Sequence, residues 1–179
     1  MENLTNYSRL SLNQITTNSW SLPEAIDGCV RAQVPSIGIW RNKIAEVGLE
    51  MSQRLLRDAG LRVSSVCRGG MFPASTREER AERIADNRKA IEEAAALGAD
   101  TLVVVCGPAP NRDLKSARQM VEDAIAQLVP YARKCKVKLG IEPLHPMLAA
   151  ERCCITSLEE ANNLADKFDR ETVGVVVDV

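Results

Sequence analysis

The sequence predicts a parallel α/β fold built from about six strand–helix units. Short apolar runs alternate with longer amphipathic segments along the 179 residues, a pattern typical of parallel strands joined by helices. Three segments carry the capping signature of a helix start, a Ser or Thr followed three residues later by Glu, at Ser21, Thr76 and Ser157. The run 101–106 does not alternate between apolar and polar residues, as expected for a strand covered on both faces.

The first strand is expected over residues 9–16, and a helix follows from 21 to about 32. The hydroxyl of Ser21 can accept a hydrogen bond from a free amide of the first turn, while Glu24 reaches back to the cap residue. A short apolar strand is then expected over residues 36–40.

The next helix is expected from about residue 43 to 59, because Gly60 can adopt the left-handed conformation that ends a helix. The third strand covers residues 61–67. It leads into the segment Arg68-Gly69-Gly70, where the glycines allow a backbone to approach a ligand closely.

A third helix is expected between the cap at Thr76 and the stop at Gly98. Ile84, Ile91 and Ala95 recur along it at helical spacing and give the segment one apolar face. The strand without alternation follows directly.

The last third of the chain repeats the same pattern. A helix is expected over about residues 113–134, with Val121, Ile125, Leu128 and Val129 on its inner face. The remaining elements are a strand over 137–142, a helix over about 157–168 and a strand over 173–178.

Two architectures remain open on periodicity alone, a doubly wound open sheet and a barrel. Neither the dinucleotide-binding motif GxGxxG nor the phosphate-binding motif GxxxxGK[ST] follows the first strand, so the nucleotide-binding open sheets lose their main support. No low-complexity linker divides the chain, and we expect a single domain over residues 1–179.

Composition argues against several classes of partner. The formal net charge is −1 and no basic run occurs, so nothing favours nucleic acid. No apolar stretch approaches the roughly 20 residues of a membrane span. The six cysteines form no CxxC pair and mostly lie in apolar runs, which favours a reducing, cytoplasmic location over a disulfide scaffold.

Two predicted strands end in a carboxylate, Glu142 after Leu-Gly-Ile and Asp178 after Val-Val-Val. In parallel α/β proteins the ligand site lies at the carboxyl ends of the strands. A single buried carboxylate there is explained by a helix cap or a salt bridge. Two on neighbouring strands repel each other unless a cation or a shared proton lies between them, so a divalent metal becomes an equal alternative.

Other candidate residues follow the same strands, and each has a structural alternative. Asn13 and Trp40 end the first two strands, where Trp40 is either a stacking surface for a sugar or a cap on the core. Arg68 can hold an anionic or polyol substrate, or its segment is a simple turn, and Arg68 and Arg152 either both meet an anion or neither does. His145, the only histidine, is a substrate contact or a surface residue rather than a metal ligand.

Three segments together resemble the sugar phosphate isomerase/epimerase family, which belongs to the xylose-isomerase-like barrel superfamily. They are Cys67-Arg68-Gly69-Gly70-Met71-Phe72-Pro73, Gly140-Ile141-Glu142-Pro143-Leu144-His145-Pro146 and Val175-Val176-Val177-Asp178. The similarity runs in the same order along essentially the whole chain. It implies a TIM-type (β/α)8 barrel, and therefore the barrel rather than the open sheet.

The resemblance also implies a divalent ion, Mn2+, Mg2+ or Co2+, and a small sugar or sugar phosphate as substrate. In the family the metal is held by a glutamate ending strand five, an aspartate ending strand six, a histidine ending strand seven and a glutamate ending strand eight. By position, Glu142 matches the first ligand and catalytic acid/base, and Asp178 matches the second ligand. The activity implied is proton transfer beside a carbonyl, as in isomerases and epimerases.

The sequence departs from the family in length. Such barrels need about 250 residues, whereas these 179 residues account for about six units. The expected molecule is therefore a truncated barrel that lacks two metal ligands and half of the proton shuttle, and its own activity is in doubt. Open strand edges favour a homo-oligomer. The alternative is a non-catalytic, self-associating fragment or pseudoenzyme that binds a small molecule.

Overall fold

The computed structural model describes residues 7–178 and contains one sheet of six parallel strands. The strands are β1 (Leu12–Asn13), β2 (Ser36–Trp40), β3 (Arg62–Gly70), β4 (Thr101–Val105), β5 (Lys138–Ile141) and β6 (Val173–Val175). Each strand pairs with its neighbours in the sequence, in the order β1-β2-β3-β4-β5-β6. A doubly wound sheet reverses its strand order at a switch point, whereas a barrel adds strands in sequence. The predicted barrel of six units is therefore confirmed.

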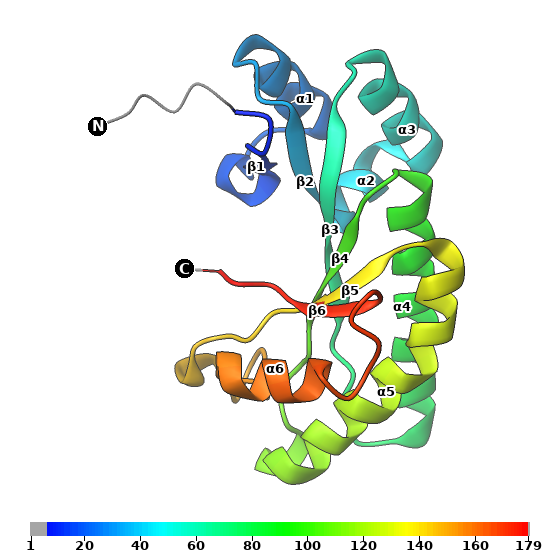
Figure 1. The fold of residues 1–179 in the computed structure, drawn as a ribbon, viewed down its shortest axis with the longest axis vertical. Coiled ribbons are helices and arrows are strands. Elements are labelled where there is room, and N and C mark those ends of the chain that lie inside the picture. Colours follow the sequence, from blue (N-terminus) through cyan, green and yellow to red (C-terminus); the bar gives the residue numbers. More distant parts are fainter. Residues whose placement is uncertain (1–6, 179) are drawn as a thin grey trace.

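Helices connect the strands (Figure 1). They are α1 (Leu22–Arg31), α2 (Arg41–Val47), α3 (Leu49–Asp58), α4 (Arg77–Ala96), α5 (Leu114–Cys135) and α6 (Leu158–Ala165), with short 3-10 turns η1 (Gln14–Thr17), η2 (Pro110–Arg112) and η3 (Pro146–Leu148). Figure 1 shows α3, α4 and α5 on one side of the strands, and the segment after β6 on the other. Within residues 7–178, no helix is both long and apolar enough to cross a lipid bilayer.

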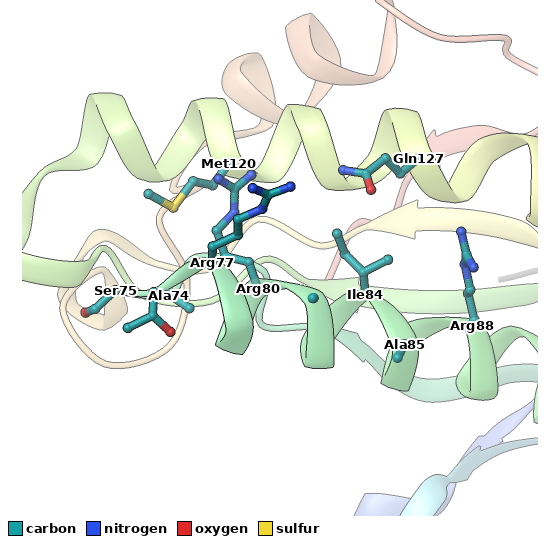
Figure 2. A pocket seen from close by; sticks show the side chains of 11 residues that line it. Ala74, Ser75, Arg77, Arg80, Ile84, Ala85, Arg88, Met120 and Gln127 are labelled. Carbon is teal, nitrogen blue, oxygen red and sulfur yellow. The ribbon is translucent and has the colours of Figure 1, made fainter.

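A cleft of about 610 Å³ lies on the outer side of this layer, between α4 and α5 (Figure 2). Arg77 and Arg80 point from α4 toward Met120 on α5. Arg80 forms an ion pair with Asp123, at 3.4 Å between Nη2 and Oδ2. None of the predicted site residues lines this cleft.

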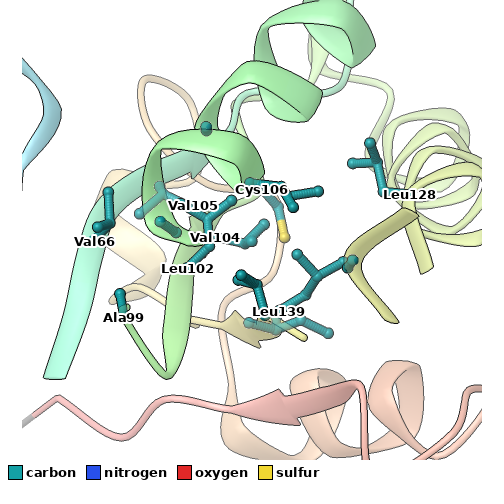
Figure 3. Close-up of a cluster of buried hydrophobic side chains, with 14 of the residues drawn as sticks. Val66, Ala99, Leu102, Val104, Val105, Cys106, Leu128 and Leu139 are labelled. Atoms are coloured by element: carbon teal, nitrogen blue, oxygen red, sulfur yellow. The ribbon is translucent and has the colours of Figure 1, made fainter. Parts of the chain in front are cut away.

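The main hydrophobic core lies between the sheet and its helices (Figure 3). Leu102 and Val104 of β4 are buried there with Leu128 of α5 and Leu139 of β5. Val103, between the two β4 residues, instead lines a cavity inside the curved sheet. This alternation follows from the period of two residues in a strand, and it separates the structural core from the interior of the barrel.

The three helix caps were predicted from local signals. Ser21 and Glu24 form the complete capping box at the start of α1. Thr76 and Ser157 also accept hydrogen bonds from the third residue of their helices. There, however, the glutamates bind the residue before the cap, since Glu79 accepts from the amide of Ser75 and Glu160 from that of Thr156.

Several predicted boundaries were wrong. The first strand is only two residues long instead of 9–16. Asn13 accepts a hydrogen bond from the amide of Ile15, and the hydroxyl of Thr16 donates to the carbonyl of Asn13, which favours the 3-10 turn η1 over a strand. The helix predicted over 43–59 is divided into α2 and α3 at Gly48, whose φ is +86°.

Other strands end either later or earlier than predicted. β3 continues to Gly70, beyond the predicted end at 67, whereas β4, β5 and β6 end at Val105, Ile141 and Val175, before their predicted ends. The helix predicted to reach 168 ends at Ala165. The hydrogen bonding of β6 nevertheless continues past its end, because the amide of Val176 donates to the carbonyl of Ile141 at 2.9 Å.

Candidate functional site

A cavity of about 560 Å³ opens inside the sheet at the carboxyl ends of the strands. Its lining includes six of the seven predicted site residues: Asn13, Trp40, Arg68, Glu142, Arg152 and Asp178. They come from β1, β2 and β3 and from the segments after β5 and β6. Residues up to 165 positions apart in the sequence, Asn13 and Asp178, therefore share one cavity.

Glu142 follows β5 directly and is half-buried. Its amide donates to the carbonyl of Val104 at 3.0 Å, which fixes the backbone beside β4. Burial raises the pKa of the Glu142 carboxyl, and the negative charge of Asp178 and a side-chain hydrogen bond with it raise the pKa further. The two carboxyl groups are therefore in direct contact.

Asp178 lies three residues after the end of β6 and is exposed. The bond from Val176 to Ile141 keeps its segment beside β5. Two carboxylates in contact cannot both be ionised at low cost unless a cation or a proton lies between them. The arrangement can thus bind a cation or hold a proton.

Two arginines bring positive charge to the same cavity. Arg68 lies in β3, where the pairing with β4 passes from Cys67 opposite Val103 to Gly69 opposite Val104. Arg68 is thus the extra residue of a bulge, a feature that re-aims a side chain at the edge of a site. Arg152 is exposed and enters the lining from the segment between η3 and α6.

Cys67 lies among these charges, and sequence reasoning did not select it as a site residue. Burial raises the pKa of its thiol to about 12, and the charge of Glu142 adds to the rise. Arg68, Arg152 and Asp178 also act on this thiol, the arginines in the opposite direction. The thiol therefore stays protonated and neutral where it lines the cavity. Cys67 could have been found from the alternation of side chains along β3, which turns Ser65 and Cys67 to the same face.

Trp40 and Asn13 form one wall of the cavity. The indole Nε1 of Trp40 donates to Oδ1 of Asn13 at 3.1 Å, and the Trp40 amide donates to Oε1 of Gln14 at 3.3 Å. These bonds hold the half-buried indole in place. An aromatic ring fixed in this way offers a flat apolar surface beside polar groups.

His145 is the predicted site residue that the structure does not bring to the cavity lining. It is exposed, and its Nδ1 accepts a hydrogen bond from the amide of Met147 at 3.2 Å, which caps η3. A substrate contact by His145 stays a prediction without geometric support.

The carboxylates of the cavity provide part of a donor set for a metal ion. Among residues 7–178, no group of three or more His, Cys, Asp or Glu side chains could hold an ion. Glu142 and Asp178 offer two carboxylates in contact, which is the oxygen chemistry that Mg2+ and Mn2+ prefer. The described residues therefore fit as part of a metal site, and further donors are needed to complete it.

The cysteines are all free thiols. Cys153 and Cys154 are fully buried, consistent with a packing role. A hydrogen bond from Cys106 lowers the pKa of Cys153 to about 6. The Sγ of Cys153 also lies 3.7 Å from the carbonyl oxygen of Glu142, so this side chain packs against the backbone of the site.

Comparison with known proteins gives a family and several similar structures. A model of the xylose isomerase-like TIM barrel family matches residues 29–179. Protein SMc04130 from Sinorhizobium meliloti 1021 is 40% identical and superposes with a TM-score of 0.91 over 95% of this chain and 62% of its own. No curated protein matches the sequence.

Two more distant structures share the fold. An IolI protein crystallised with a zinc atom has 19% identity and a TM-score of 0.80, over 94% of this chain and 62% of its own. A D-psicose 3-epimerase crystallised in the presence of D-fructose has 14% identity and a TM-score of 0.76, over 92% of this chain and 61% of its own. The present chain thus spans less than two thirds of the length of these proteins.

Proposed function

Because this chain belongs to the family of xylose isomerase-like TIM barrels, we propose that it is a metal-dependent isomerase or epimerase of a sugar or sugar phosphate. The observation that carries the proposal is the contact between Glu142 and Asp178 at the carboxyl ends of β5 and β6. In this proposal the two carboxylates bind a divalent ion, and Glu142 also moves a proton beside the substrate carbonyl.

The metal would be Mn2+, Mg2+ or Co2+, ions that accept carboxylate ligands. When bound, such an ion polarises the carbonyl oxygen of the substrate and stabilises the negative charge that develops there. Two protein ligands leave coordination positions for water, for the substrate and for donors outside the described residues. The IolI structure with zinc and the epimerase structure lend support through their shared fold.

In the metal-free chain, burial and the neighbouring Asp178 raise the pKa of Glu142, so its carboxyl can hold a proton in this cavity. A carboxyl group whose pKa approaches the working pH both accepts and returns a proton efficiently. The cavity volume of about 560 Å³ is in the range of small-molecule sites. The indole of Trp40 would pack against the apolar face of a sugar ring, while Asn13 meets its hydroxyls.

We also propose a cellular location and a class of partner for this chain. Six free thiols fit a reducing compartment, so we place the protein in the cytoplasm. The net charge of −1 offers no attraction to nucleic acid. A small molecule is the proposed substrate, and a second copy of the chain is the proposed partner.

A solvent-exchange experiment tests the activity without knowledge of the product. The chain is incubated with Mn2+ and a panel of ketoses and ketose phosphates in D2O, and NMR follows loss of the C–H signal next to the carbonyl. We expect exchange for at least one member of the panel. We also expect its loss in Glu142→Gln, while Glu151→Gln, an exposed glutamate of the neighbouring loop, retains it.

The second candidate is a non-catalytic binding protein, favoured by the lack of a third ligand-type side chain among the described residues. It predicts that a sugar binds but that no deuterium enters any member of the panel. Exchange that persists unchanged in Glu142→Gln would sink the proposed mechanism.

A further inference from the structure

Arg68 differs from the other half-buried arginines of the described chain because it has no partner. The others are bound to carboxylates or carbonyls: Arg41 to Asp86 and Glu93, Arg80 to Asp123, Arg118 to Glu160, and Arg83 to the carbonyls of Met71 and Pro73. Within residues 7–178, Arg68 makes no hydrogen bond and no ion pair. A half-buried charge is costly unless it is paired, so the guanidinium of Arg68 is held available for a ligand.

The fold holds the backbone of Arg68 firmly in this position. On its C-terminal side, the amide of Gly70 donates to Oδ1 of Asn87 at 2.6 Å, and the Gly70 carbonyl accepts from Nδ2 at 2.8 Å. On its N-terminal side, Cys67 pairs with Val103 of β4. The bulge between these fixed points is therefore a stable feature, and Arg68 lines both this cavity and a smaller cleft beside Glu82 and Asp86.

Arg152 lines the same cavity from the segment between η3 and α6, at the carboxyl ends of β4 and β5. Its amide donates to the carbonyl of Leu148 at 2.8 Å, and the neighbouring Cys153 pairs with Gly107, just after β4. Its side chain also forms no ion pair or hydrogen bond with the residues described. Arg152 and Glu142 line the same cavity.

With a divalent cation bound, the residues that line the cavity would have an excess of positive charge, which an anionic ligand could neutralise. The carboxylates of Glu142 and Asp178 would offset the two charges of a divalent cation bound between them, and two guanidinium charges remain. The fork of a guanidinium matches the oxygens of a carboxylate or a phosphate in a bidentate manner. A neutral sugar would leave both arginines without a counter-charge.

We propose that the substrate is anionic: a small sugar derivative whose carboxylate or phosphate group is bound by Arg68 and Arg152 while its carbonyl end faces Glu142 and Asp178. The catalytic half of this statement rests on the proposed function. The anion subsite itself rests only on the two arginines and the shared cavity.

Calorimetry at low ionic strength with the full chain tests the subsite. The probes are inorganic phosphate, D-fructose 6-phosphate, D-gluconate and D-fructose. We expect phosphate and at least one of the two anionic sugars to bind, and D-fructose to bind at least about tenfold more weakly. Tighter binding of D-fructose 6-phosphate identifies a phosphate subsite, and tighter binding of D-gluconate identifies a carboxylate subsite.

Variants assign the binding to the arginines. Arg68→Gln and Arg152→Gln should each weaken the anionic probes at least about tenfold, because a hydrogen bond to a charged group contributes about 1.4 kcal/mol or more. Arg68→Lys keeps the charge but loses the fork, so it should lie between Arg68→Gln and the unmodified chain. Arg77→Gln, which removes an exposed arginine of the outer cleft, should bind as the unmodified chain does.

The failures of the two proposals can be told apart. If phosphate binding depends on both arginines while Mn2+ does not bind, the proposed function fails and the anion subsite stands. If D-fructose binds as tightly as D-fructose 6-phosphate, or if Arg68→Gln and Arg152→Gln bind the anions unchanged, the inference is overturned. Circular dichroism of each variant shows that a loss of binding is not a loss of fold.

Discussion

At the end of β5, the carboxyl group of Glu142 contacts that of Asp178 in the cavity, and this contact affects the ionisation of Glu142. Burial contributes most to the raised pKa of Glu142, and the negative charge of Asp178 comes next. Both effects disfavour the ionised carboxylate when no cation is present. A bound divalent ion would reverse this balance, because it stabilises both carboxylates at once.

The raised pKa makes the stability of the metal-free chain depend on pH. The Glu142 carboxyl has a higher pKa in the folded chain than in the unfolded chain. Its contribution to the free energy of unfolding is therefore fully present below about pH 4.5 and is lost as the pH rises through the raised pKa. We expect Glu142→Gln to be more stable than the unmodified chain at pH 7 and equal to it at pH 4. Urea unfolding at several pH values measures the difference.

The control for this prediction is Glu151→Gln, which removes an exposed glutamate in the following loop. Its stability should follow that of the unmodified chain at every pH. Parallel curves for the unmodified chain and Glu142→Gln would contradict the account of this carboxyl.

At the scale of elements, the site depends on how α4 is attached to β3. Asn87, which is 1% exposed, binds both the amide and the carbonyl of Gly70, and its Nδ2 also donates to the carbonyl of Arg83. Gly70 has a φ of +103°, and a Cβ there would lie 2.0 Å from the carbonyl oxygen of Val105. The end of β3 thus requires a glycine at this position and a side-chain amide from α4.

We expect Asn87→Ala to lower the free energy of unfolding by about 3 kcal/mol, because it leaves two buried backbone groups of Gly70 without partners. Asn162→Ala in α6 is the matched control, since Asn162 is exposed and its replacement should change stability by less than about 0.5 kcal/mol. Urea unfolding measures both. Equal effects of the two changes would show that Asn87 does not hold β3.

At the scale of the whole molecule, β1 and β6 each have a single neighbour in the sheet of the described residues. Edge strands with free backbone groups pair readily with other chains. The amide of Val176 faces β5, so by alternation the amide of Val175 faces the open side. This edge is the surface through which we expect two copies to associate.

Sedimentation over a range of protein concentrations tests this association. We expect the unmodified chain to form dimers or larger species as its concentration rises. Val175→Pro should shift the distribution toward the monomer, because proline removes the N–H that pairing at the open edge requires. The prediction would be contradicted if the unmodified chain stays monomeric at all concentrations, or if Val175→Pro associates equally well.

The sequence predicted those features that local chemistry decides. The capping box at Ser21 and Glu24 needs only four residues, and it is present. The extension of β3 to Gly70 depends instead on contacts from a distant segment, the hydrogen bonds between Gly70 and the side chain of Asn87. Such contacts leave no local pattern.

The same distinction explains the candidate site. The rule that ligands lie at the carboxyl ends of parallel strands was sufficient to select five residues that share the cavity, Asn13, Trp40, Arg68, Glu142 and Asp178. It did not identify Cys67, the last residue of the predicted third strand, although this residue also lines the cavity. It also selected His145, whose imidazole binds the backbone of its own loop, because the sequence does not reveal whether a loop side chain turns inward.

A titration of the chain with Mn2+ by calorimetry, beside Glu142→Gln and Glu151→Gln, tests the central claim that Glu142 and Asp178 form a cation site. The account predicts micromolar binding that Glu142→Gln weakens at least about tenfold, equivalent to about 1.4 kcal/mol, and that Glu151→Gln retains. It also predicts that Mn2+ stabilises the unmodified chain against urea and not Glu142→Gln. Absence of binding to the unmodified chain, or equal binding to all three, would contradict the claim.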